Sequence, residues 1–172
     1  GLPAGTWRKL NYGVQPEKSK VVPIKDAMGM LETYAEVDKA LADLNGNSAA
    51  WRLSEDRAFL EGINQTMATT LFYGDSSLDP EKFTGLAPRY NSLSAENAIN
   101  IIDGAGVGSD NASIWLVVWG PNTAHAIYPK GSPAGINARD LGEDTIIDAA
   151  GGRYQGYRTH YKWDMGFTLR DW

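Results

Sequence analysis

Two histidines, His125 and His160, are the side chains best suited to general acid–base chemistry near neutral pH. Neither histidine lies in a recognisable motif that pairs it with a nucleophile and an orienting carboxylate. The chain has no cysteine, which excludes a thiolate nucleophile, a disulfide and a cysteine-bound metal. We therefore interpret both histidines as structural residues and predict that the protein is not an enzyme.

Acidic and glycine-rich segments do not predict a metal or cofactor site. Asp103 and Asp110 flank a glycine-rich loop, but their spacing is not that of an EF-hand and the closing glutamate is missing. The run GAGVG at 104–108 lacks the lysine and the strand–helix setting of a phosphate-binding loop. No cofactor and no metal are predicted.

Aromatic side chains offer a different chemistry, because the six tryptophans and eight tyrosines could form a flat platform for sugar rings. A β-rich carbohydrate-binding module is therefore the alternative function. Against it, Trp115, Trp119 and Trp163 fall in apolar or alternating segments and are expected in a core. Trp7 is the exception, since little around it in the sequence would bury it.

The composition of the 172 residues, with 42% hydrophobic and 22% charged, is typical of a folded domain. The longest apolar run, 114–119, has six residues, whereas a bilayer needs roughly 20. No membrane association is predicted. The net charge of −5 argues against a dedicated nucleic-acid binder, which would have a concentrated basic face.

A long amphipathic helix is predicted over about 49–73. Its apolar stripe has helical spacing, and Asp56 lies largely off it; the stripe consists of Leu60, Ile63, Met67 and Leu71. Ser48 or Asn47, or alternatively Ser54, could cap its start. Gly74 could end it in the left-handed conformation.

The N-terminal third is predicted to hold a hairpin and a second helix. Residues 6–24 read as a weakly buried hairpin that reverses near Gly13–Pro16. Helical spacing then predicts an amphipathic helix over 31–44, ended by Asn45-Gly46; its apolar positions are Leu31, Tyr34, Val37, Leu41 and Leu44.

The C-terminal half is predicted to be β-rich. SIWLVVWG (113–120) has the length and composition of a buried strand, and 125–128 is predicted to return beside it. Residues 129–153 are rich in glycine and are expected to be irregular. Strict alternation over 157–169 predicts a long strand with one apolar and one polar face.

The sequence resembles major capsid proteins of tailed bacteriophages, most closely those of a group of short-tailed phages. The resemblance rests on four segments spread over most of the chain: NGNSAAWRLSEDRAFLEGINQ (45–65), TLFYGDSSLDPEKFTGLAPRYNSLSAEN (70–97), SIWLVVWG (113–120) and YQGYRTHYKWDMGFTLRDW (154–172). It implies an α+β Hong Kong 97-like fold with an extended hairpin loop, a long spine helix and mixed or antiparallel sheets. Related subunits continue at both ends, so a partial chain is expected.

The resemblance also implies a domain organisation. Residues 1–30 would form the extended loop (E-loop), and 31–93 the peripheral (P) domain, with the spine helix at about 49–73. Residues 94–150 would belong mostly to the axial (A) domain, and 151–172 would form a long strand returning to the core.

The implied function is that of a structural capsid subunit. Such subunits assemble in the host bacterial cytoplasm into hexamers and pentamers, which close an icosahedral shell around packaged double-stranded DNA. Portal and scaffold components take part in assembly, related shells often carry a cementing protein, and the DNA is enclosed without sequence-specific binding. The extended loop would lie over a neighbouring subunit. The residues expected at subunit interfaces are Trp7, Arg8, Lys9, Tyr12, Lys18, Lys20, Arg57 and Glu61.

Overall fold

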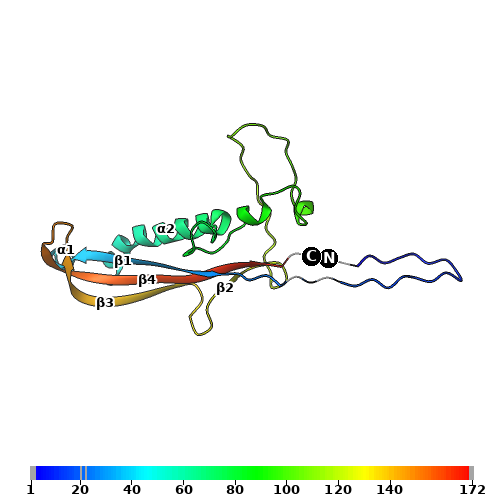
Figure 1. Cartoon of the computed structure of the whole chain (residues 1–172). Helices are drawn as coiled ribbons and strands as arrows, with labels where there is room; N and C mark the ends of the chain where they lie inside the picture. The colour runs from blue at the N-terminus through cyan, green and yellow to red at the C-terminus, as the bar shows by residue number, and fades with distance from the viewer. Residues whose placement is uncertain (1–2, 20, 22, 171–172) are drawn as a thin grey trace.

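A computed structural model describes residues 3–19, 21 and 23–170, and Lys20 and Trp172 lie outside this set. The molecule is an elongated body of one sheet and one long helix, from which an arm projects at one end (Figure 1). The sheet contains β1 (Met28–Asp38), β2 (Ala124–Ile127), β3 (Ile136–Ile147) and β4 (Arg153–Leu169). The helices are α1 (Lys39–Leu44) and α2 (Ala49–Tyr73), with short 3-10 turns η1 (Ala87–Tyr90) and η2 (Ala98–Asn100).

Strand β4 is the centre of the sheet, as its alternation predicts. It has 17 residues and pairs antiparallel with all three other strands. Gly166 pairs with both Met28 and Ile127, and Trp163 with both Leu31 and Ile136, so β1 lies on one edge of β4 while β2 and β3 share the other. Among its odd-numbered residues, Tyr161, Trp163 and Phe167 pack in the clusters that also contain residues of α2.

Helix α2 covers the apolar face of the sheet and spans the residues predicted to be helical. Ser48 caps its start, with Oγ accepting a hydrogen bond from the Trp51 backbone N at 3.2 Å. Ile63 and Met67 are buried as the stripe predicts. Two clusters fill the space between helix and sheet. One contains Met67, Phe83, Leu86, Ala124 and Phe167, and the other Ala35, Ile63 and Tyr161.

The end of α2 corrects the prediction for Gly74. This glycine follows the helix, but its φ is −60°, not left-handed. Glycine is needed there for space, because a Cβ would lie 2.5 Å from the Phe83 carbonyl oxygen and 2.6 Å from that of Thr70.

The prediction of a helix over 31–44 is wrong for residues 31–38. Residues 28–38 form β1, and only Lys39–Leu44 form a helix, α1. Burial in β1 alternates, with Ala35 and Val37 buried between exposed neighbours. Leu31, Ala35 and Val37 share the inner face of the strand, whereas Tyr34, which completed the helical spacing, lies on the outer face against His160. Pairing with β4 holds the segment as a strand.

Two predictions in the C-terminal half are also wrong. Residues 129–153 contain β3, whose polar sequence shows little alternation because it lies at a sheet edge open to solvent. Residues 113–118 form no strand, and this run meets β2 only at its end, where the Ala124 N donates to the Val118 carbonyl oxygen at 3.3 Å and Trp119 forms a single bridge with Ala124. Strand β2 pairs with β4 instead. Trp115 and Val117 pack on the core while Ile114 and Leu116 face solvent, since only one layer covers this apolar run.

Candidate assembly surfaces

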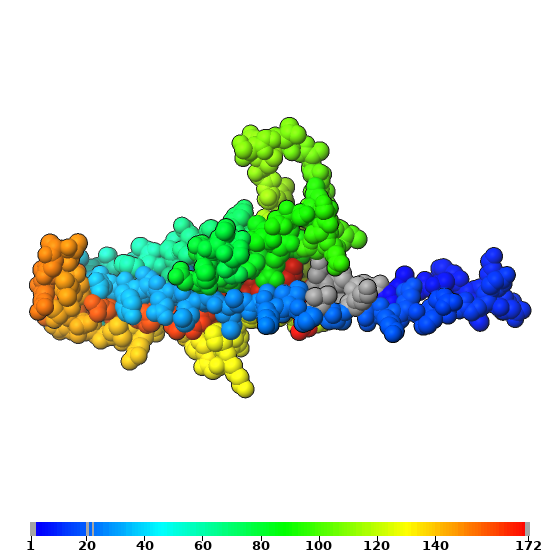
Figure 2. Space-filling view, viewed as in Figure 1, coloured from blue at the N-terminus to red at the C-terminus, as the bar shows by residue number. Residues whose placement is uncertain are grey.

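The arm, which we define as residues 3–19, is almost free of contact with the body (Figure 2). Its two extended runs lie side by side and form no strand ladder within the described residues. The Ala4 backbone N donates a hydrogen bond to Glu17 Oε2 at 2.9 Å, and the Tyr12 N donates to the Lys9 carbonyl at 3.3 Å. The arm therefore has a defined course but no core of its own.

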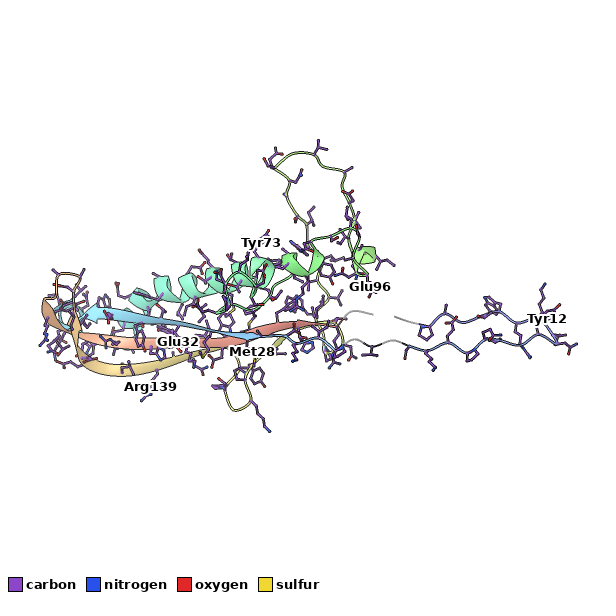
Figure 3. All side chains as sticks on the ribbon, viewed as in Figure 1. Tyr12, Met28, Glu32, Tyr73, Glu96 and Arg139 are labelled. Carbon is purple, nitrogen blue, oxygen red and sulfur yellow. The ribbon has the colours of Figure 1, made fainter. Side chains whose placement is uncertain are left out.

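The tip of the arm differs from the prediction. The chain reverses at Leu10–Asn11, where Asn11 has φ +65°, and not at Gly13–Pro16. Asparagine tolerates this left-handed conformation better than most residues. As a result, Tyr12 stands at the free end of the arm (Figure 3).

The predicted interface residues of the arm are exposed. Trp7 is 101% exposed and Tyr12 is 68% exposed, and Arg8, Lys9 and Lys18 are also open to solvent. A tryptophan fully exposed to water leaves a large apolar area unused by the fold, which is typical of residues that anchor protein interfaces. Lys20 lies outside the described residues.

The two interface residues predicted on α2 lie away from the arm. Arg57 and Glu61 are exposed and stand four residues apart, away from the buried Ile63 and Met67. Glu61 Oε1 accepts a hydrogen bond from Gln65 Nε2 at 2.7 Å. Within one chain the structure thus presents two separate surfaces, the arm and the outer face of α2.

The root of the arm is held by an ion pair that the sequence does not reveal. Arg89 Nη2 donates to Asp26 Oδ1 at 2.7 Å, and the Thr168 hydroxyl donates to Asp26 Oδ2 at 2.6 Å. Arg89 also donates to the carbonyl oxygens of Thr84 and Phe167, both at 3.1 Å. Asp26 lies between the arm and the start of β1, so these bonds hold the segment that leads from the arm into the body.

A buried polar pair between α2 and β4 is also not predicted by the sequence patterns. Asp56, predicted to lie off the buried stripe of α2, is 5% exposed, and its Oδ2 accepts a hydrogen bond from the Tyr161 hydroxyl at 2.8 Å. Burial, and then the bond to Asp56, raises the pKa of Tyr161 to about 12. This contact joins α2 to the central strand and is interpreted as structural.

The face of the sheet that α2 does not cover carries a row of charged side chains. Arg158 pairs with Glu36 and Asp144, at 2.8 and 2.7 Å, and Lys162 lies 3.5 Å from Glu32. His160 Nε2 lies 2.9 Å from Glu32 Oε2, and its ring stacks on Tyr34 with centroids 4.6 Å apart. These partners account for His160 as a surface structural residue.

Two tryptophans, Trp115 and Trp119, contact other aromatic rings instead of lying in a flat exposed row. Trp115 packs against Phe72 and Tyr90, with ring centroids 6.3 Å apart in each pair. Trp119 meets Phe167 edge-on at 6.1 Å but is 56% exposed, so the prediction that it lies in a core is wrong. Among the described residues, no group of three or more His, Asp or Glu side chains could hold a metal ion. No described helix is long and apolar enough to cross a bilayer.

An exposed arm that its own chain does not bury is typical of a protein that works by association. The family model for major capsid protein GP7 matches residues 1–172, and the chain belongs to this family. It is a structural subunit of a bacteriophage virion, which confirms the class of protein expected from the sequence. No curated protein matches the chain.

Proposed function

We propose that the chain assembles into hexamers and pentamers that close an icosahedral shell around packaged double-stranded DNA. The observation that carries this proposal is the arm, whose fully exposed Trp7 has no place to be buried within its own chain. In a closed symmetric assembly, many weak contacts of this kind add up to a rigid shell.

The proposed fold is Hong Kong 97-like, and the α+β body is compatible with it. Residues 1–30 act as the extended loop over a neighbour, and 31–93 form the peripheral domain, in which α2 takes the role of the spine helix. Residues 94–150 contribute mostly to the axial domain, and 151–172 return to the core. The polar outer face of α2 then contributes Arg57 and Glu61 to a second contact.

The proposed role requires no catalysis and no sequence-specific DNA contact, and the net charge of −5 suits a shell that must not bind phosphate strongly. Assembly takes place in the host bacterial cytoplasm with portal and scaffold components, and a cementing protein is a further candidate partner.

Electron microscopy with light scattering on the full-length chain, expressed alone, tests the proposal. We expect closed shells or capsomers of uniform size. A monomer that persists at high concentration would contradict self-assembly, and a screen of the exposed aromatic residues against glycans would then be the next experiment.

A further inference from the structure

Strand β3 forms an edge of the sheet and has little apolar surface to hold it there (Figure 1). Of its twelve residues, all of which the structure describes, only Ile146 is buried. Its backbone pairing with β4 is interrupted by a bulge between Asp140 and Gly142. Apolar packing therefore holds little of the length of β3.

The bulge turns two acidic side chains of β3 to the same face of the sheet. Side chains of a regular strand alternate, so residues 140 and 143 would otherwise point to opposite faces. Across the bulge, however, Asp140 pairs with Thr159 and Glu143 with Tyr157, which are both odd-numbered residues of β4. They share a face with Tyr161, which packs in the same cluster as Ile63 of α2. The bulge therefore aims both acids of β3 at the side of the sheet that carries the helices.

Each acid on this face meets a cation from a helix. Arg52 of α2 binds Asp140 with both terminal nitrogens, Nη1 to Oδ2 and Nη2 to Oδ1, each at 3.1 Å. Lys39 of α1 pairs with Glu143 at 2.6 Å. The Tyr157 ring lies next to both cations, with its centroid 4.8 Å from the Arg52 guanidinium carbon and 5.9 Å from Lys39 Nζ. These five side chains, which we call the clasp, join β3 to α1, α2 and β4.

The clasp consists of charges that lie at the surface. The Arg52 guanidinium, and then the Gly142 N–H, lower the pKa of the Asp140 carboxyl, so this group is charged at neutral pH. The Asp140 side chain is nevertheless 58% exposed, and that of Glu143 is 44% exposed. Salt screens the attraction between exposed charges, because the Debye length falls from about 10 Å at 0.1 M to about 3 Å at 1 M. Salt should therefore weaken the clasp and leave the apolar core intact.

We propose that the clasp is a salt-sensitive device from which β3 opens as a local unit, while α2 and the rest of the sheet remain folded. The opposite edge strand, β1, is held differently, because its Ala35 is buried against Ile63 of α2. Opening of β3 leaves this edge of β4 unpaired over residues 153–163, and an unpaired strand edge can pair with another chain. The clasp thus controls access to the edge of the central strand.

Hydrogen–deuterium exchange of dissociated full-length subunits at low and high salt tests the proposal. Between about 0.05 and 1 M NaCl, the paired amides of β3 should exchange about fivefold faster relative to those of β1 in the same sample. The paired amides of β1 serve as the internal reference for any effect of salt on exchange itself. Equal responses of β3 and β1 would overturn the proposal.

Charge exchange tests the same contact at low salt. Lys39→Glu places two carboxylates opposite each other and should raise the exchange rate of β3 about fivefold. Adding Glu143→Lys should restore slow exchange, because the two charges attract again. Lys82→Glu is the matched control, since Lys82 forms an exposed pair with Asp79 on the loop that follows α2, and it should leave β3 unchanged. No recovery in the double variant, or an equal effect of the control, would show that the clasp does not hold β3.

Discussion

The arm and strand β4 have the same extended backbone but very different surroundings. The residues of β4 are paired with β1 on one edge and with β2 or β3 on the other, and its apolar side chains lie under α2. The arm residues project into solvent, with Trp7 fully exposed. The free energy of folding must therefore come from the β4 region, whereas the apolar surface of the arm remains available for assembly. Four substitutions test this contrast, and their expected effects on the stability of one chain decrease from the core to the arm.

The largest effect is expected at Phe167, which is 0% exposed at the centre of the main cluster. Phe167→Ala should lower the free energy of unfolding by about 3–5 kcal/mol, because it removes buried apolar surface and leaves a cavity. Denaturant unfolding of dissociated subunits measures this. A loss below about 1 kcal/mol would show that β4 is not the centre of the core.

Arg89 at the root of the arm comes next. Arg89→Ala leaves the largely buried Asp26 carboxylate without its cation and should cost about 2–4 kcal/mol in denaturant unfolding. Lys82→Ala is the matched control, because Lys82 pairs with Asp79 at an exposed site and its loss should cost less than about 1 kcal/mol. Equal effects of the two substitutions would refute the role of Arg89 as an anchor.

Tyr161 should make stability depend on pH in the alkaline range. Its pKa is about 12 in the folded chain and about 10 when unfolded, so the fold favours the protonated phenol. The contribution is complete below pH 10 and is lost as the pH rises towards 12, by on the order of 2 kcal/mol. Unfolding curves between pH 9 and 12 should show this slope, and Tyr161→Phe should reduce it; an unchanged slope would assign the effect to other groups.

The smallest effect on stability is expected at the arm. Trp7→Ala should leave the free energy of unfolding within about 0.5 kcal/mol of its original value, since the side chain contacts little in its own chain. It should nevertheless weaken assembly about tenfold, as the loss of an aromatic interface anchor does. Thermal unfolding and light scattering measure the two effects. Loss of monomer stability would mean that Trp7 belongs to a core.

The parts of the fold that follow from local periodicity can be predicted from the sequence. The alternation of β4 and the apolar stripe of α2 each arise because one face of the element packs on a single layer. Strand β3 was not predictable in this way, because backbone pairing with β4 holds it while both of its faces remain largely exposed. Strand β1 was hidden because Tyr34, an apolar residue on its exposed outer face, completes a helical spacing with Leu31 and Val37.

Contacts between residues that are far apart in the sequence also could not be predicted. Asp26 and Arg89 are 63 positions apart, and Asp56 and Tyr161 are 105 apart, so no local pattern pairs them. The exposure of the arm was predictable, because its two runs lack an apolar face that could pack on the body.

Hydrogen–deuterium exchange of the arm amides, compared between dissociated subunits and assembled shells of the full-length chain, tests the central claim most directly. In dissociated subunits the arm should exchange rapidly, because its described backbone forms no strand ladder, while β4 should be protected. In shells the arm should become protected, and β4 should change little. An arm that exchanges equally fast in both states would contradict its role as the contact between subunits.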